Sequence, residues 1–417
     1  MAVELLAPAG NLEKLQIAIE YGADAVYLGG ERFGLRAGAA TFDLRTLAEG
    51  VEYAHARKRK VYVTVNIFAH PEDFEGLEDY LAALQQLGVD AILVSDPGIL
   101  LVARRVVPGM ELHLSTQANC TNEHAALFWA KQGVSRIVLA RELGLEAIRT
   151  IRKALPPSVS LEAFGHGAMC VSYSGRCLLS NFMTGHDANR GDCKQPCRWS
   201  YGVVEQKRPG EVFPVEQDGR GTYLFNSRDL CLVEYIDKMA SAGVDCLKIE
   251  GRMKSLLYVA TVTRVYRQAI DAWKKHPEGF VPDPNWKEEL ARVSERGFST
   301  GFLLGKAGPE SVRADFSGTS KRMAFLGVVQ GVSSDDGWVP VQQRAPFRVG
   351  DRVEILSPGV AQPFPVVVAR MQDQQTGEEM EKAAHPLQRL RVLFTSLYGE
   401  NPPGCVPWSL VRKGELC

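Results

Sequence analysis

The chain has 417 residues, of which 45% are apolar and 23% are charged, and its net charge at pH 7 is −1. This length allows two or three domains, and the composition excludes a mostly disordered chain and a globally basic, polyanion-binding protein. No apolar run reaches the roughly 18 residues of a membrane helix, and the N-terminus lacks the basic start of a secretory signal, so we expect a cytoplasmic protein without membrane contact.

The first 250 residues alternate short apolar runs with amphipathic, helix-like stretches. Gly22, Gly88, Gly133 and Gly243 each stand just before an apolar run, where a left-handed glycine ends the preceding helix. This alternation predicts βαβ crossovers and a parallel sheet, and eight runs favour an α/β fold of the (β/α)8 TIM-like barrel type over a doubly wound open sheet. The predicted strands cover residues 3–8, 25–29, 60–66, 91–95, 111–116, 136–140, 160–164 and 246–250.

Strands seven and eight of this pattern are about 80 residues apart, which predicts a cysteine-rich insertion at about 166–231. It follows the carboxyl end of a barrel strand, where active sites are built. Helices are predicted over 255–274 and 286–296. From about residue 320, short strands separated by Gly, Pro and Asp predict a small all-β barrel of five or six strands. We therefore expect a barrel domain (1–275), a helical linker (276–318) and a C-terminal β-barrel domain (319–417).

Five of the nine cysteines lie within 62 residues, namely Cys170, Cys177, Cys193, Cys197 and Cys231. In a reducing compartment such a group indicates metal or redox chemistry before disulfides. Only Cys193 and Cys197 have the close spacing of a structural zinc site, whereas ligands from separate loops suit a [4Fe–4S] cluster. Zinc, a redox or nucleophilic cysteine, and chemically inert buried thiols remain alternatives.

The densest motif spans residues 162–180 and has the form Glu-x-Phe-x2-Gly-Ala-Met-Cys, followed by Ser-Gly-x-Cys-x-Leu-Ser. It resembles the signature of the peptidase U32 family, the collagenase-like group. The β-rich tail is similar to the C-terminal domain of that family. Further segments that resemble the family are residues 6–10, 226–231, 248–254 and 297–301.

This resemblance implies a (β/α)8 barrel and oxygen-independent hydroxylation rather than proteolysis. Family members with such roles include a prephenate-dependent tRNA wobble-uridine hydroxylase, an rRNA cytidine hydroxylase and a pair of ubiquinone-hydroxylation proteins. The resemblance also implies a [4Fe–4S] cluster on Cys170, Cys177, Cys193 and Cys231, with Cys197 as the alternative fourth ligand. Cys231 is favoured because Asn-Ser-Arg-Asp-Leu-Cys resembles the motif of members that use this position.

The expected function is therefore iron–sulfur-dependent 5-hydroxylation of the tRNA wobble uridine, with prephenate as co-substrate and with rRNA as the other candidate RNA. The first alternative is a collagenase-like peptidase, although the chain has neither a Gly-x-Ser-x-Gly nor a His-Glu-x2-His motif. His166 lies four residues before Cys170, so a Cys–His pair is conceivable from spacing alone. The second alternative is a non-catalytic iron–sulfur scaffold that supports a partner hydroxylase.

Polar residues at the ends of strands seven and eight are the catalytic candidates: Glu162, His166, Lys248, Glu250 and Arg252. In a barrel these strand ends converge on one mouth. Strand alternation predicts that Glu162 and His166 share a face with Phe164, and that Lys248 shares one with Glu250.

Two interpretations of these charges remain open. Lys248 and a carboxylate could form a salt bridge that fills the barrel. Alternatively, Arg141, Lys248 and Arg252 could bind a small anion such as prephenate. For His166, the alternative to catalysis is an ordinary buried, hydrogen-bonded histidine.

The predicted helix over 255–274 is rich in basic residues, and Arg264 and Arg267 share one of its faces. This pattern indicates either a solvated surface or a contact with RNA phosphates. We expect Arg264 and Arg267 to bind RNA, with the C-terminal β-barrel as a second contact by analogy of fold alone.

Overall fold

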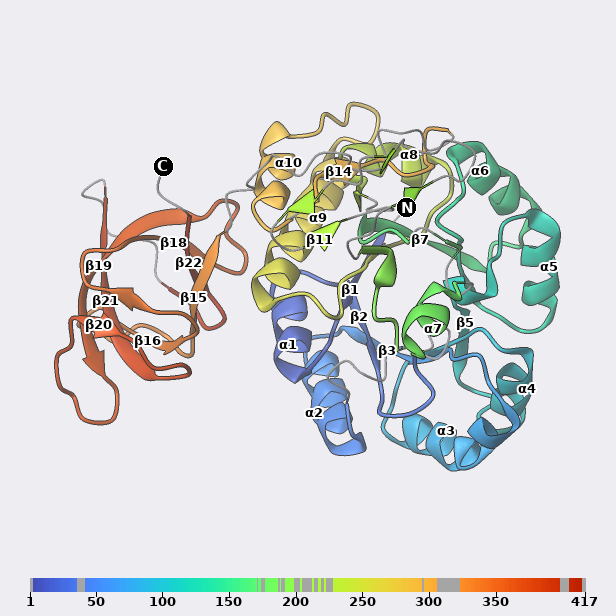
Figure 1. The fold of residues 1–417 in the computed structure, drawn as a ribbon, viewed down its shortest axis with the longest axis horizontal. Helices are drawn as coiled ribbons and strands as arrows, with labels where there is room; N and C mark the ends of the chain where they lie inside the picture. The colour runs from blue at the N-terminus through green and yellow to red at the C-terminus, as the bar shows by residue number, and fades with distance from the viewer. Residues whose placement is uncertain are drawn as a thin grey trace. The chain divides into compact units, whose positions relative to one another are not determined.

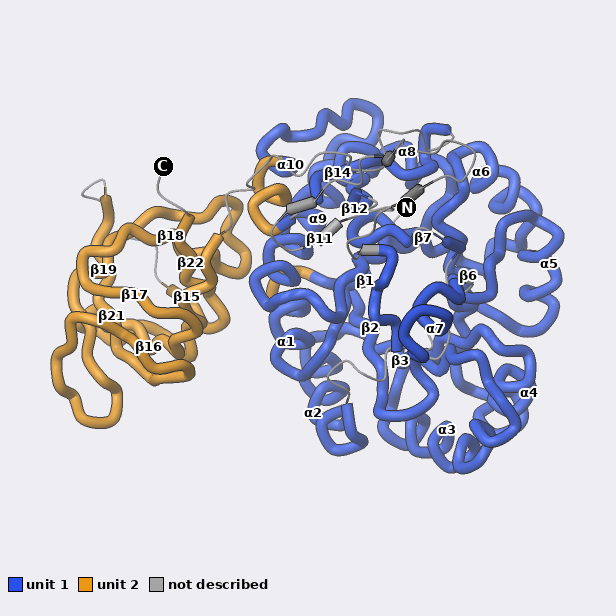
Figure 2. The backbone as a smooth tube through the Cα atoms, in the orientation of Figure 1, with its two compact units in different colours: residues 1–19, 23–287, 294–318 blue, residues 20–22, 288–293, 319–417 orange. Residues whose placement is uncertain are grey.

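The computed structural model of the chain forms two compact units (Figures 1 and 2). Unit 1 contains residues 1–19, 23–287 and 294–318, and unit 2 contains residues 20–22, 288–293 and 319–417. The structure describes residues 3–35, 42–170, 172–173, 177–186, 188, 192–198, 203–204, 212–213, 217–218, 221–222, 228–294, 296–305, 323–397 and 405–414. Ser174 and Gly175 of the motif, and residues 306–322 around the end of the predicted linker, lie outside these ranges.

Unit 1 is built on a closed barrel of eight parallel strands (Figure 1). The last strand of the barrel pairs with both the first and the seventh, which closes the ring. The predicted (β/α)8 fold is therefore confirmed, and the predicted strands differ from the observed ones only at their ends. The strands are β1 (Glu4–Pro8), β2 (Ala25–Gly29), β3 (Lys60–Val65), β4 (Ala91–Val94), β5 (Glu111–Leu114), β6 (Arg136–Val138), β7 (Ser160–Gly167) and β13 (Cys246–Ile249).

Helices surround this barrel because each crossover returns along the outside of the sheet. The four glycines that precede strands have φ angles between +77° and +102°, so each ends a helix as the sequence predicts. The predicted helix over 255–274 is present as the 20-residue α9. The helices are α1 (Leu12–Glu20), α2 (Leu44–His55), α3 (Leu77–Gln86), α4 (Pro97–Val106), α5 (Glu123–Lys131), α6 (Leu145–Ala154), α8 (Ile236–Ser241) and α9 (Leu256–Lys275).

The segment between β7 and β13 adds a strand pairing that the sequence did not predict. Strand β12 (Asp229–Cys231) runs antiparallel to the end of β7, with Cys231 opposite His166. This edge of β7 is open because β6 ends at Val138, which pairs with Glu162 lower in the barrel. The other elements here are α7 (Leu179–Thr184), β8 (Val203–Val204), β9 (Val212–Phe213), β10 (Gln217–Asp218), β11 (Gly221–Thr222) and, later in the chain, β14 (Phe298–Ser299), which pairs with β12.

Helix α10 (Pro284–Ala291) begins two residues before and ends five residues before the predicted helix over 286–296. The Asp283 carboxylate accepts a hydrogen bond from the backbone N–H of Asn285, and Pro284 needs no such partner at the start of a helix. These two neighbouring residues therefore set the earlier start.

Unit 2 contains a closed antiparallel barrel in the strand order β15-β16-β21-β19-β18-β22. The prediction of a small β-barrel is confirmed, and its sixth strand is β22. Alternating residues of these strands point inward and form an apolar core. The strands are β15 (Ala324–Val329), β16 (Trp338–Gln343), β18 (Arg352–Leu356), β19 (Phe364–Asp373), β21 (Arg389–Ser396) and β22 (Leu410–Lys413), with the short pair β17 (Phe347–Arg348) and β20 (Lys382–Ala383) beside them.

Candidate functional site

Four side chains of alternating charge form a continuous chain of ion pairs inside the unit 1 barrel. Arg136 Nη1 lies 2.6 Å from Glu4 Oε1 and 3.5 Å from Glu162 Oε2. Lys248 Nζ lies 2.8 Å from Glu162 Oε1. Arg136, Glu162 and Lys248 are all buried. The structure therefore contains the internal salt bridge that the sequence left as one of two interpretations for Lys248.

The charge of Glu162 is set by these neighbours. Burial alone would raise the pKa of this carboxyl group, but the ammonium of Lys248 and the guanidinium of Arg136 hold the pKa below its usual value. Glu162 is therefore a carboxylate at neutral pH, and it is the counter-ion that allows Lys248 to lie inside the barrel.

At the other end of this series of ion pairs, the Glu4 carboxylate contacts polar groups near the amino ends of the strands. The phenol of Tyr62 lies 3.2 Å from both carboxylate oxygens of Glu4, and the Cys246 thiol lies 3.4 Å from Glu4 Oε1. Burial raises the pKa of both Tyr62 and Cys246, so each is protonated and can donate to Glu4. His113 packs edge-on against Tyr62, and burial lowers its pKa. This layer therefore stabilises the partly buried carboxylate of Glu4 through neutral hydrogen-bond donors.

A second layer of charge lies nearer the carboxyl ends of the strands. Arg141 Nη2 is 3.5 Å from Glu250 Oε2, and its guanidinium lies 3.9 Å from the ring centroid of Phe164. The Tyr27 phenol donates to the Ile249 carbonyl and lies 3.4 Å from Glu250 Oε2. The Lys248 ammonium lies 4.2 Å from the ring centroid of Tyr27, which connects the two layers. Lys248 and Glu250 thus both reach the interior, as strand alternation predicts.

Arg252 lies at the same end of the barrel but contacts the loop that follows β2. Its guanidinium donates to the Leu35 carbonyl, and Nη1 lies 3.4 Å from Thr64 Oγ1. A Cβ atom at Gly29 would lie 2.3 Å from Nη1, so a side chain at this position would displace the guanidinium. Arg252 is therefore buried and holds the loop, in addition to any role in anion binding.

His166 is not on the interior face with Glu162 and Phe164, so that prediction is wrong. The pairing of β7 with β13 contains an irregularity: Lys248 pairs with Phe164, and the next residue, Ile249, pairs with His166. Gly165 is the extra residue, and it reverses the alternation of the strand.

After this irregularity the His166 ring faces aromatic residues rather than the barrel interior. It lies against Tyr258 and Tyr266 of α9 and against Phe298. Its Nδ1 atom is 3.4 Å from the Tyr266 hydroxyl, and burial lowers its pKa to about 3. His166 is therefore a neutral, buried histidine, which is the structural alternative that the sequence left open.

The five clustered cysteines differ in accessibility. Cys170 and Cys193 are exposed, Cys177 and Cys197 are partly exposed, and Cys231 is buried. Burial raises the pKa of Cys231 to about 11, and its sulfur lies 4.0 Å from the Tyr266 hydroxyl. Thiols are suitable ligands for an iron–sulfur cluster, so the donor set fits in kind. Among the described residues, however, no three His, Cys, Asp or Glu side chains are close enough together to hold a metal ion.

The two arginines of the predicted RNA contact on α9 are not freely exposed in the structure. Arg264 is only 6% exposed. Arg267 lies between two carboxylates, with Nη1 2.9 Å from Asp24 and Nη2 2.6 Å from Asp271. Arg264 and Arg267 are three positions apart on α9, as the sequence predicts, but Arg264 is buried and the guanidinium of Arg267 is occupied by carboxylates.

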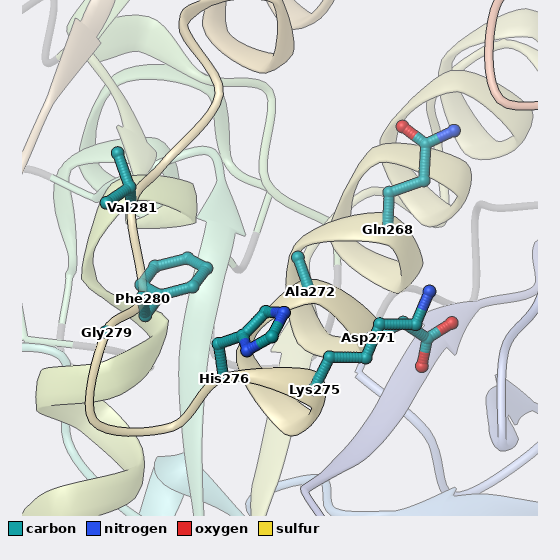
Figure 3. A pocket seen from close by; sticks show the side chains of 8 residues that line it. All are labelled: Gln268, Asp271, Ala272, Lys275, His276, Gly279, Phe280 and Val281. Atoms are coloured by element: carbon teal, nitrogen blue, oxygen red, sulfur yellow. The ribbon is translucent and has the colours of Figure 1, made fainter.

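A surface cavity of about 470 Å3 lies at the carboxyl end of α9 (Figure 3). The helix starts directly after β13 and is about 30 Å long, since an α-helix rises about 1.5 Å per residue. The cavity is therefore at the opposite end of the barrel from the strand ends that carry Glu250 and Arg252, and we assign it no part in the site. Its lining consists of Gln268, Asp271, Ala272, Lys275, His276, Gly279, Phe280 and Val281.

Sequence reasoning missed Glu4 and Arg136, which complete the interior ion pairs. Both residues stand within otherwise apolar predicted strands, where a charge must find a partner. That signal could have identified them, but it could not have paired them, because Glu4 and Arg136 are 132 positions apart in the sequence.

Comparison with known proteins follows the same division into two units. Residues 10–313 match Peptidase family U32, and residues 321–411 match the Peptidase family U32 C-terminal domain. The chain is 44% identical to tRNA hydroxylation protein P1 of Bacillus subtilis (strain 168), over 99% of this chain and 95% of that protein. It is 36% identical to tRNA hydroxylation protein P of Escherichia coli (strain K12), over 85% of this chain and 86% of that protein. It is also 36% identical to a protein named Collagenase of Porphyromonas gingivalis (strain ATCC BAA-308 / W83), over 78% of this chain and 79% of that protein.

Within the described residues, no helix combines the length and the hydropathy that crossing a membrane requires.

Proposed function

The chain belongs to peptidase family U32, and we propose that it is a cytoplasmic enzyme that hydroxylates a base of RNA without molecular oxygen, with the wobble uridine of tRNA as its substrate. The observation that carries this proposal is the similarity to the Bacillus subtilis tRNA hydroxylation protein P1, which extends over nearly the whole chain. Because the similarity covers both matched domains, the proposal does not rest on one shared domain alone.

The charges inside the barrel are the argument for a small anionic co-substrate. Among the described residues, the charged side chains discussed above are four basic groups and three acidic groups, a formal excess of one positive charge: Arg136, Arg141, Lys248 and Arg252 against Glu4, Glu162 and Glu250. Arg141, Lys248 and Arg252 are the members nearest the carboxyl ends of the strands. Prephenate carries two carboxylates and suits such a site, and Glu162 and Glu250 then orient the cations that bind it.

For the cofactor, we propose a [4Fe–4S] cluster on Cys170, Cys177, Cys193 and Cys231, with Cys197 as the alternative to Cys231. Three of these thiols are at least partly exposed in the segment after β7, at the carboxyl end of the barrel. When bound, the cluster would supply electron transfer or substrate activation. The chain itself would hold the anion, exclude water from the barrel and place the RNA base at the mouth.

The test is nucleoside mass spectrometry of tRNA and rRNA from a strain in which the gene is deleted. We expect 5-hydroxyuridine at the wobble position to disappear and to return with the wild-type gene, but not with Cys170→Ser. Cys405→Ser, which changes a buried cysteine of unit 2, is the matched control and should restore the modification. Unchanged wobble hydroxylation in a deletion strain without a paralogue would contradict the tRNA assignment. The remaining candidate functions would then be hydroxylation of rRNA and a non-catalytic scaffold role for a partner hydroxylase.

Peptide hydrolysis is the second candidate function, because one relative is named Collagenase. Within the part of the chain that the structure describes, Cys231 lies opposite His166 on adjacent strands, and both side chains approach the Tyr266 hydroxyl. Both side chains are buried, and the raised pKa of Cys231 disfavours the thiolate that such an enzyme needs. We therefore expect no gelatin cleavage by homogeneous protein. Cleavage that is present in the wild type and lost in Cys231→Ser would favour the peptidase.

A further inference from the structure

Helix α7 (Leu179–Thr184) presents an apolar surface to solvent. Phe182 is 88% exposed and Leu178, one residue before the helix, is 66% exposed; Tyr173 is 53% exposed. The only buried residue of α7 is Ser180, whose hydroxyl accepts a hydrogen bond from the backbone N–H of Lys194. The usual amphipathic arrangement is therefore reversed, since a polar residue anchors the helix and large apolar side chains face outward.

Such an arrangement is unfavourable for a protein alone in water. An exposed phenylalanine forgoes the stabilisation that burial of its ring would provide, and contiguous apolar patches on a protein surface mark interaction sites. Leu178 and Phe182 are four positions apart and so lie on the same side of this helical turn. Leu178 and Phe182 thus form a small apolar platform that fits a flat partner, and Tyr173 is a further exposed aromatic residue of the same segment.

The place of this platform indicates what the partner is. Helix α7 follows β7 and therefore belongs to the carboxyl end of the barrel, and Figure 1 shows it inside the ring of helices. Residues 170–200 contain four basic and two acidic residues, a net charge of +2 in a chain whose total is −1. Aromatic side chains within a basic segment are the pattern by which proteins bind single-stranded nucleic acid, with bases stacked on the rings and phosphates near the cations.

We propose that the platform of Leu178 and Phe182, in a segment that also exposes Tyr173, binds an unpaired nucleobase of the RNA substrate by stacking, beside the base that enters the barrel. This inference rests on the proposed RNA hydroxylase function and adds the surface that recognises the RNA. Phe182 is the main stacking residue, because its ring is the most exposed of the three. The platform is a contact separate from Arg264 and Arg267 of α9.

The experiment measures the binding of an anticodon stem-loop RNA to the full-length protein by fluorescence anisotropy. Phe182→Ala should raise the Kd about tenfold, in line with the loss of one base–aromatic stack. Phe182→Trp should restore the affinity, and Phe182→Leu should not, because only the former retains a π-face. Phe128→Ala is the matched control, since Phe128 is 53% exposed on α5 and should not affect binding.

A second readout detects stacking directly. With 2-aminopurine in the loop of the RNA, wild-type protein should quench its fluorescence on binding, and Phe182→Ala should not. Iron content, measured in parallel, should be the same in both proteins. A duplex RNA without a loop should bind weakly and with the same affinity to both.

Three results would overturn this inference. One is an unchanged Kd for Phe182→Ala while the wild type binds and hydroxylates RNA, which would reject the platform but retain the proposed function. Another is sedimentation data in which Phe182→Ala dissociates a dimer without affecting RNA binding, which would assign the surface to a second copy of the chain. The third is wild-type protein that neither binds nor hydroxylates RNA, in which case the proposed function fails together with the platform.

Discussion

Lys248 on β13 and Glu162 on β7 form a buried ion pair, with 2.8 Å between Nζ and Oε1. The pair joins the lower layer, which contains Glu4 and Arg136, to the upper layer around Tyr27 and Glu250. Glu162 is also 3.5 Å from Arg136, so the carboxylate is shared between two cations. Lys248 is thus a residue whose removal should affect both folding and function.

Lys248→Met should lower the free energy of unfolding by about 3 kcal/mol, because it leaves Glu162 buried with one cation fewer. It should also abolish the hydroxylated product. The double variant Lys248→Met/Glu162→Gln should recover most of the stability, since Arg136 keeps its pair with Glu4, but none of the activity. Urea unfolding and nucleoside mass spectrometry measure the two effects. Single and double variants of equal stability would show that the two side chains are not coupled.

The buried His166 should make stability dependent on pH. Its pKa is about 3 in the folded protein, against about 6.5 for an unfolded histidine. Between these two pH values, His166 is protonated in the unfolded state but not in the folded state. The stability contributed by neutral His166 is therefore complete above about pH 6.5 and decreases as the pH falls toward 3. The expected slope is about 1.4 kcal/mol per pH unit near pH 5.

Urea unfolding at several pH values measures this slope. It should decrease in His166→Gln and stay unchanged in His276→Gln, which alters an exposed histidine. A His166 ring that NMR shows to titrate near pH 6.5 in the folded protein would contradict the prediction.

Anaerobically purified protein should contain about four irons per chain, as one cubane cluster requires. Cys170→Ser and Cys177→Ser should lose the iron, and Cys405→Ser should retain it. Comparison of Cys231→Ser with Cys197→Ser identifies the fourth ligand. Iron and sulfide analysis is the measurement, and stoichiometric zinc without sulfide would be the contrary result.

Arg267→Glu should destabilise the barrel without a specific effect on RNA binding. The substitution places a third carboxylate beside Asp24 and Asp271, so we expect a loss of about 2 kcal/mol. The dependence of RNA affinity on salt concentration should keep its slope, because no phosphate contact is removed. Lys274→Glu, an exposed change in the last turn of α9, should leave stability within about 0.5 kcal/mol of the wild type. If the RNA affinity of folded Arg267→Glu depended less on salt concentration than that of the wild type, Arg267 would be shown to contact RNA phosphates.

The sequence by itself determined the architecture of both domains. The eight barrel strands, the glycines that end the preceding helices and the small β-barrel all depend on patterns within a few neighbouring residues. Gly22 and Gly243, for example, adopt the left-handed conformation because the chain must turn there from helix to strand. The family signature around Cys170 is equally local, and it led to the family before any contact was known.

Only the tertiary structure decided which charged and polar residues face the site. Gly165 reverses the alternation of β7, so His166 packs against α9, and this depends on the register between β7 and β13. Arg264 is buried although its helix pattern is also that of a basic surface. Glu4 and Arg136 meet only when the barrel closes. Periodicity shows which residues share a face, whereas the partner of that face depends on segments far apart in the sequence.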